Sequence, residues 1–198
     1  MFTGIIQEIG KVVNFSNGDL EISTALDLSD CKIGSSICCN GVCLTAKEIN
    51  FINQNYYFKA NVGEETIFRS NFSENLFNKS IPINLEKSLK MGDEISGHYV
   101  YGHVDCVTKI KKINRLDNSW EFVFDKNFKE HNSLIVEKGS ISINGISLTI
   151  AKIAPNQFIV SIIQHTFDNT NLKFAKQNDF VNIEFDYLAR YILNKHDK

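Results

Sequence analysis

Three cysteines lie close together in the stretch CCNGVC, at Cys38, Cys39 and Cys43. Thiols at this spacing are typical of part of a zinc or redox site, which makes the stretch a metal-binding candidate. A structural zinc site needs four Cys or His ligands, and no histidine lies near this stretch in the sequence. The metal hypothesis therefore depends on whether the fold itself requires the thiols.

Other groups that could act as an acid, a base or a nucleophile are spread along the chain. They are Glu65, His98, His103, Asp105, Lys138, Ser147, His165 and Asp186. A hydrolase triad of Ser147, His103 and Asp186 can be drawn, but Ser147 lacks the Gly-x-Ser-x-Gly elbow and lies in a strand-like segment. His98 and His103 form an H-x4-H pair without a third metal ligand. No P-loop or Gly-x-Gly-x-x-Gly motif offers a cradle for nucleotide phosphates.

The chain repeats itself, and the repeat relates these candidates to one another. CCNGVCLTAKEI (38–49) aligns with SINGISLTIAKI (142–153), FTGII (2–6) with VYGHV (100–104), EETIFRSNF (64–72) with QHTFDNTNL (164–172), and INLE (83–86) with VNIE (181–184). The offsets are 104, 98, 100 and 98, so the order of the segments is kept. We infer a duplicated domain of about 95 residues per copy.

The duplication argues against a metal site in the cysteine stretch. In the second copy, the positions of Cys38, Cys39 and Cys43 are held by Ser142, Ile143 and Ser147. An isoleucine at one of these positions indicates that the fold needs no thiol there, and Cys39 is interpreted as a small buried apolar residue. Cys43 and Ser147 are both small and polar, which makes them a matched pair of candidate site residues.

Each copy has the pattern of a β-rich domain. Segments such as ISTALDL, YYFKANV, SWEFVFD and QFIVSII combine alternation with β-branched and aromatic residues. Asn-Gly pairs at 40–41 and 144–145 predict tight turns between apolar runs. Short strands at roughly ten-residue spacing in so small a unit predict a closed barrel. EETIFRSNF and HNSLIVEK are interpreted as helical turns that pack on or plug such a barrel.

The predicted division is a first barrel over residues 1–97, a second over 98–186 and a C-terminal helix over 187–198. LEKSLKMGDEISG (85–97) is polar and ends in glycine, which is typical of a link between domains. In the tail, Leu188, Tyr191 and Ile192 have helical spacing with Arg190 on another face, a stripe that favours a packing or subunit contact.

The overall composition indicates a soluble cytoplasmic protein. The formal net charge of −2 is spread without long blocks, so there is no electrostatic footprint for nucleic acid. The piece TKIKK (108–112) alternates charged and apolar residues, as the solvated face of a strand does. No apolar run reaches the roughly 18 to 20 residues of a membrane helix. The start lacks the features of a signal peptide, and five cysteines favour reduced thiols in a cytosol.

These patterns together describe a duplicated β-barrel with small polar residues after each Asn-Gly turn. Such a design suits the binding of two similar flat polar molecules, one per copy, and chemistry becomes feasible where two such sites face each other. At MFTGIIQEIG, NGVCLT, GHYVYGHVD and NGISLT, the chain resembles the riboflavin synthase family of the α-chain type over essentially its whole length.

The resemblance implies an all-β fold of two six-stranded antiparallel Greek-key barrels, each lumazine-binding, with a short C-terminal helix that helps to assemble a homotrimer. It implies a transferase that moves a four-carbon unit between two molecules of 6,7-dimethyl-8-ribityllumazine, giving riboflavin and 5-amino-6-ribitylaminopyrimidinedione, the last step of riboflavin biosynthesis. It implies no metal and no organic cofactor, an active site between neighbouring subunits, and it leaves an association with lumazine synthase open.

The resemblance also implies functional residues. Those expected to act in catalysis are Phe2, Cys43, His103, Ser147 and Asp186. The N-terminal segment is expected to line the acceptor or the donor pocket, through Thr3, Gly4, Ile5 and Ile6. Those expected to contact substrate in the first copy's pocket are Cys43, Leu44, Thr45, Asn61, Val62, Gly63, Glu64, Glu65 and Thr66. Those expected to fill the second copy's pocket are Gly102, His103, Val104, Lys138, Ser147, Leu148, Thr149, Ser161, Ile162, Ile163, Gln164, His165 and Thr166.

Some positions depart from the family pattern, and alternatives stay open. His165 stands where the first copy has Glu65, so the two pockets are expected to differ, and Gln164 stands where members often carry proline. FNKSIPINLE is less regular than the usual piece, which leaves the alignment uncertain over residues 73–82. A non-catalytic lumazine- or flavin-binding protein of the antenna type is the alternative to the enzyme, and a barrel used only for protein contacts is a third reading.

Overall fold

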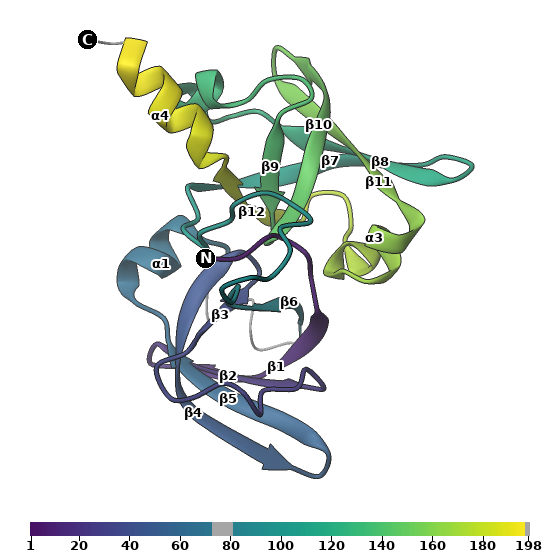
Figure 1. The fold of residues 1–198 in the computed structure, drawn as a ribbon. Helices are drawn as coiled ribbons and strands as arrows, with labels where there is room; N and C mark the ends of the chain where they lie inside the picture. The colour runs from purple at the N-terminus through teal and green to yellow at the C-terminus, as the bar shows by residue number, and fades with distance from the viewer. Residues whose placement is uncertain (73–80, 197–198) are drawn as a thin grey trace.

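The computed structural model describes residues 1–72 and 81–196, and these form two closed six-stranded antiparallel barrels. Figure 1 shows the first copy below the second, with the N-terminus between them. The strands of the first barrel are β1 (Glu8–Ser16), β2 (Asp19–Thr24), β3 (Ser36–Cys39), β4 (Val42–Ile52), β5 (Asn55–Asn61) and β6 (Pro82–Lys87). They are ordered β1-β2-β5-β4-β3-β6 around the closed sheet.

The second barrel repeats this order, which confirms the duplication. Its strands are β7 (Cys106–Arg115), β8 (Ser119–Asp125), β9 (Ser140–Ile143), β10 (Ile146–Ala154), β11 (Gln157–Ile163) and β12 (Phe180–Phe185). The order is β10-β11-β8-β7-β12-β9, so each strand has the neighbours of its counterpart in the first copy. Closure satisfies the backbone groups of both edge strands, which is how a domain this small avoids an exposed sheet edge.

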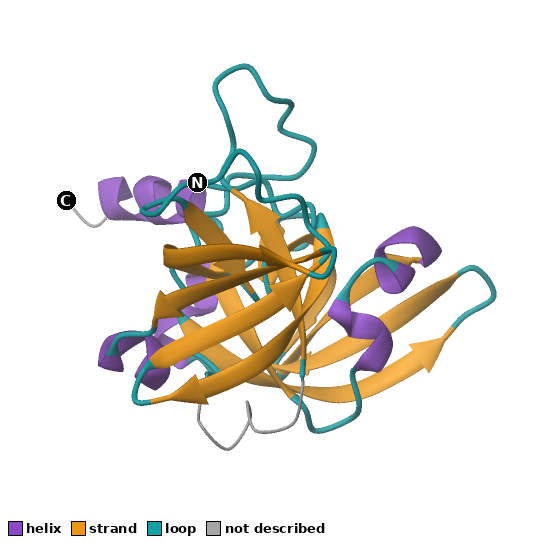
Figure 2. Ribbon diagram, turned by 90° about the horizontal axis from the view of Figure 1, so that it is seen from below, coloured by secondary structure: helices purple, strands orange, loops and turns teal. Residues whose placement is uncertain are grey.

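The helices are short and lie at the periphery of the strands, as Figure 2 shows. They are α1 (Glu64–Arg69), η1 (Lys129–Leu134), α3 (Gln164–Asp168), η2 (Asn171–Phe174) and α4 (Tyr187–His196). The helical turn expected in EETIFRSNF is confirmed, and α4 confirms the C-terminal helix. In HNSLIVEK only the first residues are helical, because the chain is already extended at Ile135.

The expected link over residues 85–97 is wrong at its first three residues. Leu85, Glu86 and Lys87 belong to β6, where Leu85 and Glu86 are buried. The linking chain therefore begins at Ser88. It reaches the second copy through Val100, which forms an isolated antiparallel bridge with Phe2.

Both predicted Asn-Gly turns are confirmed. Asn40 and Gly41 have φ of 49° and 81°, and Asn144 and Gly145 have φ of 48° and 79°, the left-handed values that two-residue hairpin turns require. A Cβ on Gly41 would lie 2.8 Å from the backbone nitrogen of Gly145, so the two turns meet back to back. The barrels are joined at this point by the side chains of Asn84 and Asn182, which donate to the carbonyls of Asn144 and Asn40 at 3.0 Å and 2.9 Å.

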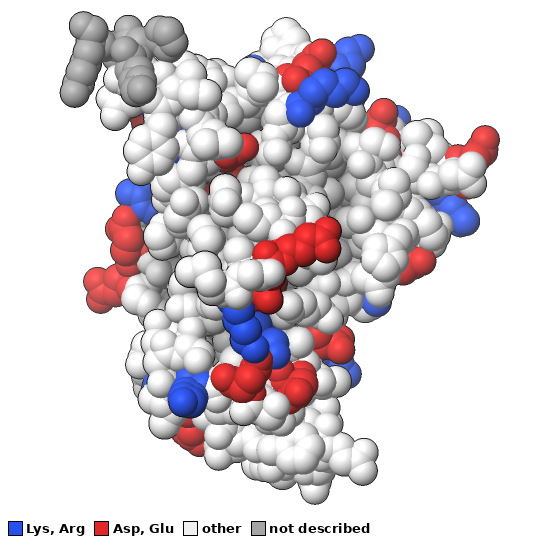
Figure 3. Space-filling view, in the orientation of Figure 1, with Lys and Arg blue, Asp and Glu red and all other residues white. Residues whose placement is uncertain are grey.

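The cores follow the period-2 pattern of the strands. In β7, Thr108 and Ile110 are buried while Lys109, Lys111 and Lys112 face solvent, as TKIKK predicts. Cys39 is fully buried in the core of the first barrel, which confirms its expected packing role. Figure 3 shows acidic and basic side chains interspersed on one face of the molecule, with no patch of basic residues. Within the described part of the chain, no helix has the length and apolar character needed to cross a membrane.

Candidate active site

The first residues of each copy cross to the other copy's barrel. Phe2 and Val100 exchange two backbone hydrogen bonds of 2.7 Å and 3.0 Å at the centre of the molecule. Beyond this bridge, the carbonyl of Gly4 accepts from the Ser147 N–H on β10 at 2.8 Å, and the carbonyl of Gly102 accepts from the Cys43 N–H on β4 at 2.8 Å. The two matched candidate residues are thus each covered by a segment from the opposite copy.

Glycine is required at both contact points. A Cβ on Gly102 would lie 2.6 Å from the Cβ and the backbone nitrogen of Cys43, and a Cβ on Gly4 would lie 2.6 Å from the same atoms of Ser147. Both glycines also have positive φ, 78° and 77°, which other residues adopt at a cost. The shared glycine of FTGII and VYGHV is therefore explained by a close approach to the opposite barrel.

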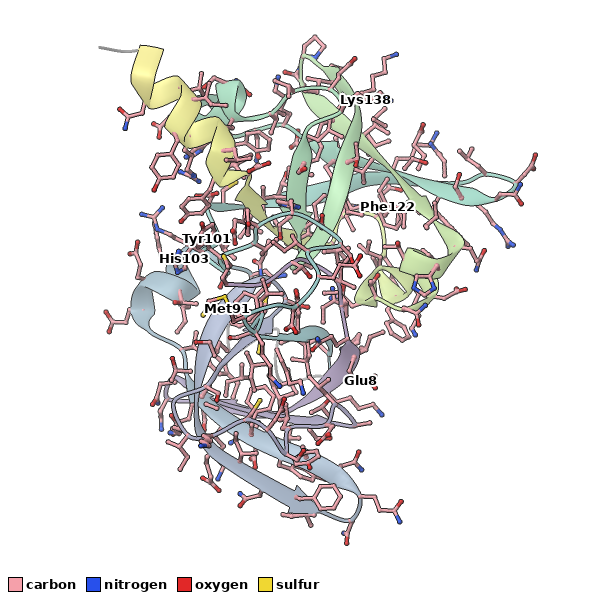
Figure 4. All side chains as sticks on the ribbon, in the orientation of Figure 1. Glu8, Met91, Tyr101, His103, Phe122 and Lys138 are labelled. Atoms are coloured by element: carbon pink, nitrogen blue, oxygen red, sulfur yellow. The ribbon has the colours of Figure 1, made fainter. Side chains whose placement is uncertain are left out.

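The first candidate site is a hollow of about 200 Å³ beside Cys43. It is lined by Val42, Cys43, Glu65, Thr66, Arg69, Gly102, His103 and Val104. His103 Nδ1 lies 3.2 Å from the hydroxyl of Tyr187, and the rings of Tyr101 and Tyr187 pack with centroids 4.2 Å apart. Figure 4 shows Tyr101 and His103 together near α1 and the start of α4.

The expected grouping of Gly102, His103 and Val104 with the second copy's pocket is wrong. The crossing carries these residues to the first barrel, where Val104 packs on the core. In the reciprocal arrangement, Ile6 packs against the core of the second barrel. The echo of FTGII and VYGHV indicated that the segments were equivalent, but not on which barrel each would lie.

The second candidate site centres on Ser147, whose hydroxyl contacts the imidazole of His98. His98 Nδ1 lies 2.6 Å from Ser147 Oγ, and the His98 backbone N–H donates to the Thr3 carbonyl at 3.1 Å. Burial lowers the pKa of His98, and the negative charge of Asp186 partly offsets this. The structure agrees with the rejection of a triad of Ser147, His103 and Asp186, because His103 lies beside Tyr187 and Cys43.

Two buried carboxylates hold the crossing segments, and the sequence interpretation missed both. Glu86 on β6 accepts from Thr3 N at 2.7 Å, Thr3 Oγ1 at 2.9 Å and Gly4 N at 3.0 Å. Glu184 on β12 accepts from the N–H groups of Tyr101, Gly102 and His103 at 2.6, 2.8 and 2.9 Å. The available signal was a glutamate at matched positions in INLE and VNIE, within segments that otherwise read as strands.

The comparisons with known proteins bear on both copies. The lumazine binding domain model matches residues 3–88 and 101–186. The riboflavin synthase of Saccharomyces cerevisiae is 38% identical over 207 residues, which cover 97% of this chain and 84% of the relative. That of Brucella abortus is 39% identical over 197 residues, covering 96% of both chains.

The chain belongs to the riboflavin synthase family. Crystal structures of LumP complexed with riboflavin and with 6,7-dimethyl-8-(1'-D-ribityl) lumazine superpose with TM-scores of 0.76 and 0.75, over 93% of this chain. Their sequence identities are 21% and 20%, so these likenesses establish the fold alone.

The remaining residues implied by riboflavin synthase membership fall into three kinds of position. Leu44, Leu148, Val62 and Ile162 are buried in the barrel cores. Gly63 and Ile163 directly precede α1 and α3. In α1, Glu65 pairs with Arg69. In α3, Gln164 donates to Asp168, and His165 Nδ1 contacts Asn169 just after the helix. Exposed or half-buried positions are held by Ile5, Thr45, Asn61, Glu64, Thr149, Ser161 and Thr166.

Asp186 and Lys138 have local roles in the structure. Asp186 Oδ1 accepts from the Leu188 N–H at 3.0 Å, at the start of α4. Lys138 has a positive φ of 69° in the turn before β9, and its N–H donates to the Ile150 carbonyl at 2.8 Å. Figure 4 places Lys138 at the far end of the second barrel from Tyr101 and His103. Its role as a substrate contact stays a prediction.

The buried Glu184 predicts a specific dependence of stability on pH. Burial raises the pKa of its carboxyl from 4.5 to about 6, although its three N–H partners lower the value. Because the folded state binds the proton more tightly, the unfolding free energy falls as pH rises from about 4.5 to about 6, by about 2 kcal/mol for this group.

Urea unfolding of the wild type and Glu184→Gln at pH 4.5 and pH 7 measures this contribution. Glu86 and His98 titrate in both proteins, so their contributions cancel in the comparison. We expect the stability advantage of the wild type over the variant to shrink by about 2 kcal/mol between the two pH values. An advantage that grows with pH would contradict the raised pKa.

Proposed function

We propose that this protein catalyses the dismutation of two molecules of 6,7-dimethyl-8-ribityllumazine to riboflavin and 5-amino-6-ribitylaminopyrimidinedione. One molecule donates a four-carbon unit and the other accepts it. The atoms and electrons of two lumazines equal those of the two products, so the transfer needs no external oxidant or reductant. The observation that carries the proposal is that the first residues of each copy lie on the opposite barrel. Gly4 meets Ser147 and Gly102 meets Cys43, so these two side chains hold equivalent positions on two barrels of the riboflavin synthase family.

The side chains at the two sites suit the chemistry that this transfer needs. The 7-methyl group of the lumazine is acidic because its anion is delocalised into the ring. A neutral imidazole can accept a proton near pH 7, and the lowered pKa of His98 keeps it neutral beside the Ser147 hydroxyl. In the first site, His103 and Thr66 line the hollow beside Cys43 and offer hydrogen bonds to a bound ring.

Orientation is the second contribution that the fold offers. Holding two reactants in a productive geometry replaces a bimolecular encounter, and effective molarities of about 10⁵ M and above are known for well-oriented groups. Two barrels of one duplication carry Cys43 and Ser147 at equivalent positions, which suits two identical substrates. The duplication therefore explains why a binding domain repeated in one chain can act as an enzyme.

We further propose that the complete site forms in a homotrimer, between the first barrel of one subunit and the second barrel of its neighbour. The supporting feature is α4, which projects from the second barrel in Figure 1 and exposes Leu188, Tyr191 and Ile192 by 61%, 69% and 59%. Exposed apolar residues at helical spacing are typical of a helix that packs on a partner. A cytoplasmic location and an association with lumazine synthase stay predictions.

Substitution of this stripe tests the assembly. We expect Tyr191→Glu with Ile192→Glu to shift the protein from trimer to monomer, because charges in an apolar contact lose their hydration. Multi-angle light scattering after gel filtration measures the mass. Glu replacement of the solvent-facing Lys112 on β7 is the control and should leave the mass unchanged. A wild type that is monomeric at assay concentrations would contradict the trimer.

The activity is tested with purified protein, the lumazine alone and a chelator in metal-free buffer. Riboflavin is followed by its absorbance, and one mole formed per two moles of lumazine consumed is the expected result. Lumazine that stays bound and fluorescent without product would move the protein to the antenna class. No change in lumazine fluorescence would favour the reading of a barrel used only for protein contacts.

A further inference from the structure

The two buried glutamates, Glu86 and Glu184, occupy equivalent positions in the two copies. Solvent hardly reaches either carboxylate, so their charge must be stabilised by protein groups. Glu86 and Glu184 are 3% and 2% exposed. Burying a carboxylate is costly unless its oxygens are hydrogen-bonded, and each of these accepts three hydrogen bonds from the crossing segments. Charge-assisted bonds of this kind are stronger than neutral ones, so both carboxylates are strong anchors for short pieces of irregular backbone.

The anchors act across the molecule. Glu86 belongs to the first barrel, but the Thr3–Gly4 backbone it holds lies against Ser147 of the second barrel. Glu184 belongs to the second barrel, but the Tyr101–His103 backbone it holds lies against Cys43 of the first. Each candidate site is thus completed by a segment whose anchor sits on the opposite barrel.

Among the described residues, other contacts also reach the crossing segments: the Thr3 carbonyl accepts from the His98 N–H at 3.1 Å, and the ring of Tyr101 packs on Tyr187. The Phe2–Val100 bridge ties the two segments to each other, so it cannot set either one independently. The glycine carbonyls reach the opposite strands through one backbone bond each. Each carboxylate accepts three hydrogen bonds from one segment, so it can position that segment separately from the other.

We propose that Glu86 and Glu184 are positioning residues for the proposed lumazine reaction, each fixing the site of the opposite barrel. Glu184 holds Gly102 and His103 at the Cys43 site, and Glu86 holds Thr3 and Gly4 at the Ser147 site. The kinetic part of this proposal rests on the proposed function. The structural part does not, because it concerns which segment each carboxylate holds in place.

Alkylation of thiols reads the two sites separately and needs no substrate. Cys43 is half-buried at the first site, while Cys39 is fully buried in the first barrel's core and reports global opening. A second reporter is the thiol introduced by Ser147→Cys. Each background carries wild-type glutamates, Glu86→Gln or Glu184→Gln. Iodoacetamide labelling is quantified at each cysteine by tandem mass spectrometry, because Cys38, Cys39 and Cys43 share one tryptic peptide.

The expected pattern is crossed. Glu184→Gln raises the labelling rate of Cys43 by about tenfold, the scale expected when hydrogen bonds to a charged acceptor are lost, and leaves the reporter at position 147 unchanged. Glu86→Gln does the reverse, and Cys39 stays unlabelled in both. Labelling that rises on each glutamate's own barrel, or on both sites equally, overturns the proposal.

If Cys39 of a glutamine variant is alkylated, that variant has unfolded and cannot report on the sites. Milder variants then keep the test decisive. Thr3→Val removes only the Thr3 Oγ1 bond to Glu86, and Glu184→Asp keeps the charge with a shorter reach. Each should give the same crossed pattern at lower amplitude, and its absence overturns the proposal.

Kinetics then connect positioning to the reaction. For riboflavin formation, kcat should fall more than KM rises in both glutamine variants, because a displaced site loses alignment. Crossed labelling with no riboflavin from the wild type would reject the proposed function alone. Riboflavin formation with unchanged kcat in both variants would reject the positioning role alone.

Discussion

Gly102→Ala is expected to lose about 2 to 5 kcal/mol of unfolding free energy and about 100-fold in riboflavin formation. The Cβ would lie 2.6 Å from the Cβ and the backbone nitrogen of Cys43, where no flexible side chain can yield. The left-handed φ of 78° adds a cost of roughly 1 to 2 kcal/mol for an L-residue, and overpacking typically costs about 1 to 3 kcal/mol. The segment must therefore move, and displacement of about 1 Å at a reacting centre can cost about 100-fold in rate.

Gly92→Ala is the matched control for backbone strain. Gly92 lies in the linking chain with φ of 93°, and nothing lies within 4 Å of the position of its Cβ. Gly92→Ala should therefore lose only the unfolding free energy due to the positive φ, about 1 to 2 kcal/mol. Its rate of riboflavin formation should equal that of the wild type. Urea unfolding and steady-state assays of both variants separate strain from contact. Equal losses in the two proteins would mean that the approach to Cys43 is unimportant.

Much of the fold was predictable because its determinants are local. Alternation in QFIVSII and SWEFVFD specifies strands that bury one face, and Asn-Gly specifies the hairpin turns at 40–41 and 144–145. The echo of these elements at a nearly constant offset predicted the duplication, and short strands in a small unit predicted closure. These features each depend on a few neighbouring residues, so they can be inferred without knowledge of long-range contacts.

The composition of the sites was harder to predict because it depends on long-range pairing. In a duplicated protein, a segment such as VYGHV has two equivalent places to dock, and local sequence does not choose between them. His98 and His103 are five residues apart, on either side of the bridge between Phe2 and Val100. His98 lies beside Ser147, while His103 lies at the Cys43 site, and these placements depend on long-range contacts that local sequence does not specify.

Glu86 and Glu184 escaped notice because a glutamate in a strand usually faces solvent. In β6 and β12 these glutamates are buried, and each holds the first segment of its own copy, Thr3–Gly4 at Glu86 and Tyr101–His103 at Glu184. The matched asparagines Asn84 and Asn182 are buried for a related reason, at the joint between the barrels. Polar residues repeated at equivalent positions of both copies were therefore the sign of contacts between barrels.

The hydrogen bond between Ser147 and His98 predicts that the two side chains act as one unit. Their 2.6 Å contact and the lowered pKa of His98 provide a neutral imidazole that can exchange a proton with the hydroxyl. General acid–base groups contribute about 10²- to 10⁴-fold to a rate. We expect Ser147→Ala and His98→Asn each to lower kcat by about 100-fold, and the double variant to be no slower than either, since groups that act as a unit are not additive.

Ser142→Ala is the control for removal of a hydroxyl at this place. Ser142 lies directly opposite Ser147 across β9 and β10, and its Oγ is buried without a hydrogen-bond partner among residues 1–72 and 81–196. Loss of an unpartnered buried hydroxyl should be neutral or slightly stabilising, and kcat should stay within about twofold of the wild type. Additive losses in the Ser147 and His98 double variant would show that the two residues work independently, and the proton exchange between them would then be abandoned.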